Sequence, residues 1–230
     1  MIVDGARLGQ ALGAVRSRIE AACRRSGRDA SDVRLIAVTK TVGVDAIAAA
    51  RDLGVTDFGE NYAKELAAKA SRIDATWHFV GKVQRGTAAV LATHADVVHS
   101  AEPGEGIARL AKRAEKAGRT IPCLVQVDYT GRRQGVAEED VGAFVAEAAG
   151  LPGIRIIGLM TLPPPADRAE DARPYFARLR ELRDRLRKSV PEVRELSMGM
   201  SFDYEVAVEE GATMVRVGTA LFGDRPVARP

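Results

Sequence analysis

Cysteine is scarce in this chain of 230 residues, which has only two. Cys23 and Cys123 lie far apart and have no neighbours at the spacing of metal ligands. The sequence therefore predicts neither a zinc site nor a disulfide framework. This cysteine usage fits a reducing compartment, and we expect a cytoplasmic protein.

Long apolar runs and a strong charge bias are also missing. No segment approaches the roughly 20 consecutive apolar residues that a membrane helix requires. The N-terminal residues lack the charged and then apolar pattern of a signal peptide. The 34 basic and 31 acidic residues give a net charge of +3, too balanced to indicate nucleic acid binding. We expect a soluble protein with neither a membrane nor a nucleic acid partner.

Strand-like and helical segments alternate along the chain after an opening helix at residues 6–26. Strands are expected at 34–39, 57–59, 76–81, 97–100, 122–128, 154–160, 195–198 and 214–218. Helices are expected at 44–53, 62–73, 85–92, 104–117, 138–149, 174–190 and 202–209. Eight strands joined by seven helices predict an α/β fold, a single (β/α)8 TIM barrel with an extra N-terminal helix, spanning residues 1–230 as one domain.

The alternative fold is an open doubly wound sheet, which uses the same alternation of strands and helices. Such sheets commonly carry a glycine-rich G-x-G-x-x-G loop after the first strand. Here the first strand ends in Val38-Thr39-Lys40-Thr41, which lacks that pattern. Dinucleotide binding is therefore disfavoured.

Two small-residue turns lie near the C-terminus, at residues 197–201 and 217–220. Gly218 allows close approach of the backbone, and Ser201 and Thr219 add hydroxyl groups. The loops after strands 7 and 8 of TIM barrels often bind phosphate, so these turns are a candidate phosphate site. Plain turn chemistry is the alternative explanation of each turn taken alone.

Lys40 ends the first strand, where a barrel gathers its functional residues. Closure of the barrel would place this lysine beside the two small-residue turns. Burial would make the amine a usable nucleophile that forms a Schiff base. A ligand with an aldehyde and a phosphate matches this arrangement, and pyridoxal 5′-phosphate (PLP) is such a cofactor. A surface lysine that merely ends a strand is the alternative.

Three further residues are candidates for contact with such a cofactor. Arg216 would donate to the ring nitrogen and keep it unprotonated, unless it only forms an ordinary ion pair. Asn61 would orient the phenolic oxygen, or instead cap the following helix. His78 alternates with Trp77 and Phe79, and a satisfied core histidine competes with an acid–base role.

Several ordered motifs resemble one known family. They are Ala37-Val38-Thr39-Lys40-Thr41, residues 58–62 (FGENY), residues 77–81 (WHFVG) with Gln84, residues 158–161 (GLMT) and the block 196–223. Over residues 35–223 the chain resembles the pyridoxal-phosphate homeostasis protein family (YggS-like), which has the alanine racemase N-terminal-domain barrel.

The resemblance implies a role for each candidate residue. Lys40 is implied to form the Schiff base, Ser201, Gly218 and Thr219 to contact the phosphate, and Arg216 to pair with the ring nitrogen. Asn61 and His78 match family positions near the cofactor. The sequence departs from the family at 85–87 and at Arg133-Gln134-Gly135, which puts a second, lysine-based exchange site in doubt. Arg132 and Arg133 could still bind an anionic ligand.

The resemblance implies a carrier that holds PLP reversibly, serves intracellular PLP homeostasis and has no catalytic turnover. A PLP-dependent amino-acid racemase is the main alternative, but it needs a second acid–base group over the opposite face of the cofactor. We expect no second domain to supply one, because the barrel uses nearly all of the chain. A phosphate-sugar aldolase is weaker, since the Lys40 segment offers no carboxylate. Apoenzymes that need PLP are expected recipients, and a monomer is expected.

Overall fold

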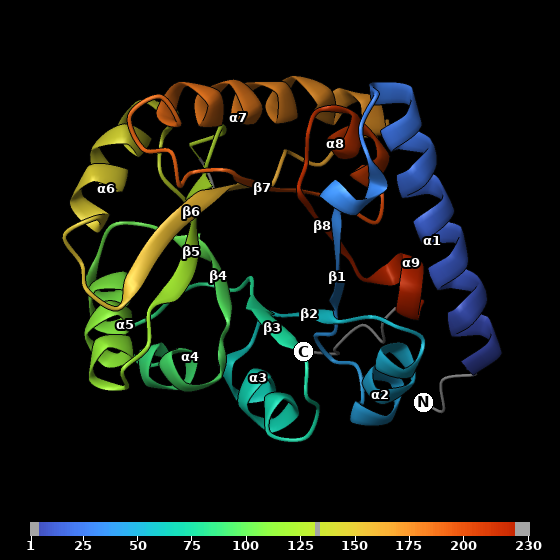
Figure 1. Ribbon diagram of the computed structural model, residues 1–230, viewed down its shortest axis with the longest axis horizontal. Helices are drawn as coiled ribbons and strands as arrows, with labels where there is room; N and C mark the ends of the chain where they lie inside the picture. The colour runs from blue at the N-terminus through green and yellow to red at the C-terminus, as the bar shows by residue number, and fades with distance from the viewer. Residues whose placement is uncertain (1–4, 132–133, 224–230) are drawn as a thin grey trace.

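Eight parallel strands close into a barrel in the order of the sequence, and β8 pairs with β1. A computed structural model describes residues 5–131 and 134–223 of the chain (Figure 1). The strands are β1 (Arg34–Val38), β2 (Asp57–Glu60), β3 (Thr76–Phe79), β4 (Val97–Ala101), β5 (Ile121–Val127), β6 (Ile154–Thr161), β7 (Glu195–Met200) and β8 (Met214–Val217). The predicted (β/α)8 barrel is confirmed.

Helices surround the barrel, as Figure 1 shows. They are α1 (Gly5–Ser26), α2 (Val44–Asp52), α3 (Ala63–Ala70), α4 (Ala88–His94), α5 (Glu105–Lys116), α6 (Val141–Ala148), α7 (Arg173–Leu186), α8 (Tyr204–Glu209) and α9 (Thr219–Phe222). Short 3-10 turns η1 (Ala30–Asp32), η2 (Glu138–Asp140) and η3 (Ala169–Ala172) precede β1, α6 and α7. The extra N-terminal helix α1 packs beside α8 and α9.

Two predictions about the C-terminal helices need correction. The helix expected from residue 202 begins at Tyr204, because residues 201–203 form a turn and Asp203 is the N-cap. The second small-residue turn leads into α9, a single helical turn that the sequence analysis did not predict. Both differences lie beside the candidate phosphate site.

Apolar side chains form two separate clusters. The larger one fills the layer between strands and helices, and α1 contributes Leu8, Leu12, Val15 and Ile19 at helical spacing. The smaller cluster comes from strands alone and lies inside the barrel. Its members are Ile36, Val97, Leu124, Met160 and Met214. Polar side chains of other strands complete this interior, and they are described below.

The carboxyl ends of the strands form one mouth of the barrel. Loops there carry Lys40 after β1, Asn61 after β2, Ser201 after β7 and Gly218 after β8. Parallel pairing therefore brings residues that are distant in sequence to one end. Within the described ranges, no helix is long and apolar enough to cross a membrane.

Candidate functional site

A hollow of about 450 Å³ opens at the carboxyl ends of the strands. Its lining is Val38, Lys40, Asn61, Val80, Met160, Leu162, Met200, Ser201, Phe202, Arg216, Gly218 and Thr219. The structure thus brings together every predicted cofactor contact except His78. Among these lining residues the only ionisable side chains are Lys40 and Arg216.

The backbone on both sides of Lys40 is held by buried polar groups. Thr39 is fully buried, and its hydroxyl donates to Glu60 Oε1 at 2.6 Å. Thr41 has a φ of +64°, an uncommon conformation for a β-branched residue. Its N–H donates to Glu65 Oε2 at 2.8 Å, which secures that conformation. The chain therefore turns sharply at the half-buried Lys40.

Lys69 of α3 connects these groups. Its Nζ donates to Glu60 Oε1 and Glu65 Oε2, each at 2.6 Å, and to the Thr39 carbonyl oxygen at 2.7 Å. Burial raises the pKa of Glu60, although Lys69 and Thr39 act in the opposite direction. The sequence analysis missed this cluster. A lysine on the buried face of an amphipathic helix was the available signal.

Asn61 lies at the hollow and does not cap the next helix. The N-cap of α3 is Tyr62, which makes no side-chain capping bond. The Asn61 backbone packs against Gly81, where a Cβ atom would come within 2.0 Å of the Asn61 carbonyl oxygen. Glycine at 81 is therefore required for Asn61 to occupy this place.

The two small-residue turns are joined by Ser201. Its Oγ accepts from the backbone N–H groups of Gly218 and Ala220, at 3.1 and 3.3 Å. Asp203 orders the first turn, because its Oδ1 accepts from the Met200 N–H at 2.6 Å. The hydroxyls of Ser201 and Thr219 are donors suited to anion oxygens, while the Gly218 and Ala220 N–H groups donate to Ser201 Oγ.

Arg216 is 4% exposed and projects from β8 into the base of the hollow. Its guanidinium donates from one terminal nitrogen to Ser197 Oγ at 2.5 Å, and from the other to the Thr161 carbonyl oxygen at 3.0 Å. Burial lowers the pKa of Arg216 to about 10, against the attraction of the Asp203 carboxylate. The side chain thus stays charged at neutral pH.

His78 lies inside the barrel and outside the lining of the hollow. Its Nε2 is 2.9 Å from Asp57 Oδ1, and its Nδ1 is 2.8 Å from His99 Nε2. Both ring nitrogens are therefore engaged by protein groups. The alternative of a satisfied core histidine describes this geometry, and a cofactor contact at His78 stays a prediction.

The remaining predicted anion site, Arg132-Arg133, falls outside the described residues. The interior residues Asp57, His99 and Ser197 were missed by the sequence analysis. Each stands in a strand at a position that faces the barrel interior, and strand alternation was the signal available.

The fold and the site define a class, the (β/α)8-barrel proteins whose ligand site lies at the carboxyl ends of the strands. Residues 11–226 match the family model described as alanine racemase, N-terminal domain, and the chain belongs to this family. The resemblance inferred from the motifs is confirmed.

Relatives that match over nearly their whole length include pyridoxal phosphate homeostasis proteins. A pyridoxal phosphate homeostasis protein of Aquifex aeolicus is 38% identical over 220 residues, covering 93% of this chain and 96% of the relative. A protein of the same name from Pseudomonas aeruginosa is also 38% identical, over 221 residues, covering 94% and 95%. PipY of Synechococcus elongatus, solved with PLP bound, is 34% identical with a TM-score of 0.83, covering 94% of this chain and all of PipY.

Proposed function

We propose that this protein binds pyridoxal 5′-phosphate as a Schiff base at Lys40 and serves intracellular PLP homeostasis without catalytic turnover. The observation that carries the proposal is the hollow, which combines Lys40 and Arg216 with Ser201, Gly218 and Thr219. We call the place where the two small-residue turns meet, at Ser201 and Gly218, the Ser201–Gly218 corner. The names of the relatives and the PLP-bound PipY structure support the same ligand.

The residues of the hollow fit each part of the cofactor. Its volume of about 450 Å³ suits a small aromatic ligand. The donors around Ser201 and Thr219 suit a phosphate, and Arg216 is a buried cation that can donate to a ring nitrogen. The bound cofactor supplies an aldehyde carbon for the Lys40 amine. Asn61, which also lines the hollow, would donate to the phenolic oxygen.

A carrier is favoured over a racemase by what the hollow lacks. Racemisation requires an acid–base group on each face of the cofactor. Lys40 is one such group, but the lining residues include no tyrosine, histidine, cysteine or carboxylate. Arg216 remains charged and would hold the ring nitrogen of a bound cofactor unprotonated, which would make it a poorer electron acceptor.

The visible spectrum of the purified protein, with and without added PLP, tests the proposal. We expect a Schiff-base band that borohydride reduction fixes at Lys40, as mapped by mass spectrometry. Lys64 is a matched control, because it is an exposed lysine on the adjacent α3. Lys64→Ala should keep the band and Lys40→Ala should lose it. The same band in Lys40→Ala would refute the assignment.

The racemase alternative is tested separately. We expect no loss of optical rotation from L-alanine in the presence of the loaded protein. Time-dependent loss above the Lys40→Ala level would favour the enzyme. As further parts of the proposal, residues 1–230 form one PLP-binding domain, the protein is a cytoplasmic monomer, and PLP-dependent apoenzymes receive the cofactor.

A further inference from the structure

A continuous hydrogen-bond chain crosses the barrel interior and ends at Arg216. From Asp57 Oδ1 it passes to His78 at 2.9 Å and from His78 to His99 at 2.8 Å. It continues from His99 Nδ1 to Ser197 Oγ at 2.8 Å and from Ser197 to Arg216 at 2.5 Å. His78, His99 and Ser197 are fully buried. The chain joins strands β2, β3, β4, β7 and β8.

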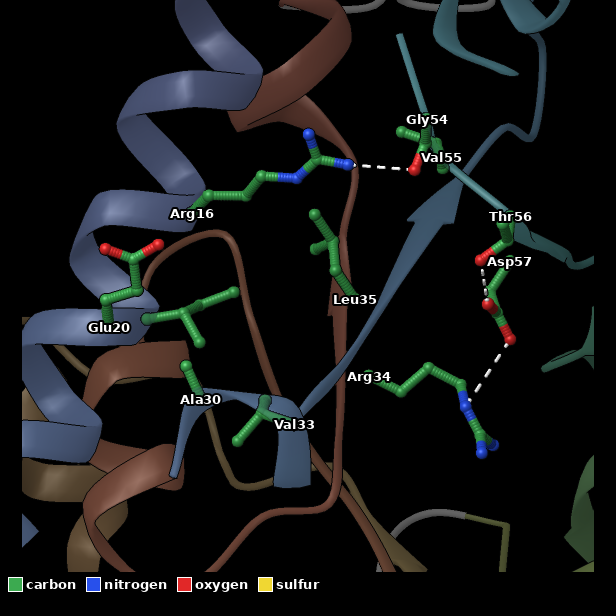
Figure 2. Close-up of a pocket in the computed structure, with 11 residues that line it drawn as sticks. Arg16, Glu20, Ala30, Val33, Arg34, Leu35, Gly54, Val55, Thr56 and Asp57 are labelled. Atoms are coloured by element: carbon green, nitrogen blue, oxygen red, sulfur yellow. Dashed lines mark hydrogen bonds and ion pairs between the residues drawn. The ribbon is translucent and has the colours of Figure 1, made fainter. Parts of the chain in front are cut away.

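The far end of the chain lies at the amino ends of the strands. Figure 2 shows Asp57 there, with Thr56 and Arg34 beside it. Thr56 Oγ1 donates to Asp57 Oδ2 at 2.7 Å, and Arg34 Nε is 3.6 Å from Asp57 Oδ1. These residues line a hollow of about 300 Å³, opposite the mouth that holds Lys40. The chain thus spans the barrel between its two ends.

The chemistry of the groups at the two ends fixes the direction of the hydrogen bonds there. Burial raises the pKa of Asp57, but the bonds from His78 and Thr56 outweigh it and hold the pKa below its usual value. The carboxylate therefore only accepts, so His78 Nε2 carries a proton. Burial and the nearby cations push the pKa of His99 well below its usual range, so His99 is neutral.

One arrangement engages every group between the Asp57 carboxylate and Arg216. His99 Nε2–H donates to His78 Nδ1, and the Ser197 hydroxyl donates to His99 Nδ1. Ser197 then presents a lone pair to Arg216, a guanidinium that only donates. Each link depends on the one before it, so the Asp57 charge orients the acceptor at Arg216.

We propose that Asp57, His78, His99 and Ser197 are positioning residues that set the orientation of the Arg216 guanidinium toward the ring nitrogen of the cofactor. This inference rests on the proposed function. Two of the Arg216 donors are used by Ser197 and Thr161, and the Arg216 side chain also lines the hollow. The nearest members of the chain are neutral, and its carboxylate is kept at the opposite end.

The chain serves orientation and not proton delivery. Arg216 has no lone pair and stays charged, so a proton cannot pass through it to the cofactor. A carboxylate in contact with a ring nitrogen would favour its protonation, whereas a charged guanidinium opposes it. The orientation of Arg216 therefore decides the electronic state of the cofactor.

The first test uses the protein without cofactor and 15N-labelled histidine. The protein has only three histidines, His78, His94 and His99, so single His→Gln variants assign the NMR signals. We expect neutral imidazoles protonated at Nε2 for both His78 and His99. In the Asp57→Asn variant, the 15N signal of His78 should change, and the signal of His99 should change with it. The opposite tautomer in either ring would overturn the inference.

The second test compares Ser197→Ala with Ser100→Ala, both loaded with PLP labelled with 15N at the ring nitrogen. Ser100 is a buried serine next to His99 whose hydroxyl donates to the Gly81 carbonyl oxygen, outside the chain. Ser197→Ala should shift the ring-nitrogen signal and weaken PLP binding about tenfold, the usual effect of losing a hydrogen bond to a charged group. Ser100→Ala should leave the ring-nitrogen signal in place.

The outcomes separate this inference from the function on which it rests. If the unmodified protein gives no Lys40-dependent PLP band, the proposed function fails, while the histidine tautomers still test the chain itself. If the unmodified protein binds PLP and Ser197→Ala has the same ring-nitrogen signal and affinity, the positioning role is overturned. Circular dichroism of each variant confirms that it is folded.

Discussion

His99 is a neutral imidazole enclosed in the barrel, and this gives stability a defined pH dependence. Burial, with the positive charges of Arg216 and Arg34 nearby, holds its pKa in the folded protein well below the ordinary 6.5. Below about pH 6.5, His99 therefore binds a proton in the unfolded chain but stays unprotonated in the folded protein. We expect the free energy of unfolding to fall as the pH drops below this value, by up to about 1.4 kcal/mol per pH unit.

The comparison of His99→Gln with His94→Gln checks this prediction. His94 lies at the end of α4 and is only partly buried. Urea unfolding at about pH 7 and about pH 5.5 should show a flatter pH dependence in His99→Gln than in the unmodified protein. His94→Gln should keep the original slope. Equal slopes in all three proteins would contradict the assignment of His99 as a group that stays neutral in the folded protein.

Lys69 is the shared partner of two carboxylates beside Lys40. Replacing it by methionine keeps the length of the side chain but leaves Glu60, which is fully buried, without its cation. We expect Lys69→Met to lose about 3 kcal/mol of stability, the usual cost of breaking a buried ion pair from one side. Borohydride labelling of Lys40 should also slow, because Lys69 no longer binds the Thr39 carbonyl oxygen or the Glu60 and Glu65 carboxylates that accept from Thr39 and Thr41.

The exposed Lys64 on the same helix provides the control for this substitution. Lys64→Met should change the free energy of unfolding by less than about 0.5 kcal/mol. Denaturant titration of both variants makes the comparison. A Lys69→Met protein as stable as Lys64→Met would show that the buried cluster contributes nothing.

At the scale of elements, the Ser201–Gly218 corner depends on how closely α8 packs against β7. Gly199 has a φ of +90°, and a Cβ atom there would lie 2.5 Å from Ala207 Cβ and 2.9 Å from Tyr204 Cα. Gly199→Ala therefore combines backbone strain with overpacking, and we expect a loss of about 3 kcal/mol. Displacement of α8 should also weaken PLP binding through Ser201.

The same glycine-to-alanine substitution in α1 should have the opposite effect on the free energy of unfolding. Gly13 is exposed within that helix, and a Cβ atom would meet nothing within 4 Å. Gly13→Ala should raise the free energy of unfolding by about 0.5–1 kcal/mol, because alanine loses less conformational entropy in a helix. Thermal or urea unfolding of the two variants measures the contrast. Destabilisation by both, to the same extent, would refute the packing explanation for Gly199.

The strands could be predicted because each is a short apolar run between turn residues. The run before Lys40 and the run ending at Val217 are such cases, and both were placed within one residue of their observed ends. The start of α8 was predicted two residues too early, and α9 was not predicted. Their boundaries depend on the Asp203 capping bond and the Ser201 bonds between loops, which no local pattern encodes.

At the scale of the whole molecule, the mouth of the barrel could be predicted and its interior could not. Lys40, Ser201 and Gly218 follow strands, so parallel closure alone brings them together. The interior chain joins His78 to His99 and Ser197 across three strands. Its partners depend on register and side-chain rotamers, which the sequence pattern does not specify.

Ligand binding should stabilise the entire barrel, because the site takes residues from both ends of the chain. Lys40 follows β1, whereas Gly218 and Thr219 follow β8, and unfolding separates them. At a free PLP concentration about 100 times the dissociation constant, we expect about 2.7 kcal/mol of added stability. Urea unfolding at a series of PLP concentrations measures this gain.

Pyridoxal without its phosphate, and inorganic phosphate alone, separate the two halves of the site. Each should stabilise the unmodified protein less than PLP at equal concentration, because each uses only one end of the hollow. In Lys40→Ala the gain from PLP should fall toward that from phosphate, since only the Ser201–Gly218 corner and Arg216 remain. Equal stabilisation of Lys40→Ala and the unmodified protein by PLP would mean that the lysine does not link the two ends of the chain through the cofactor.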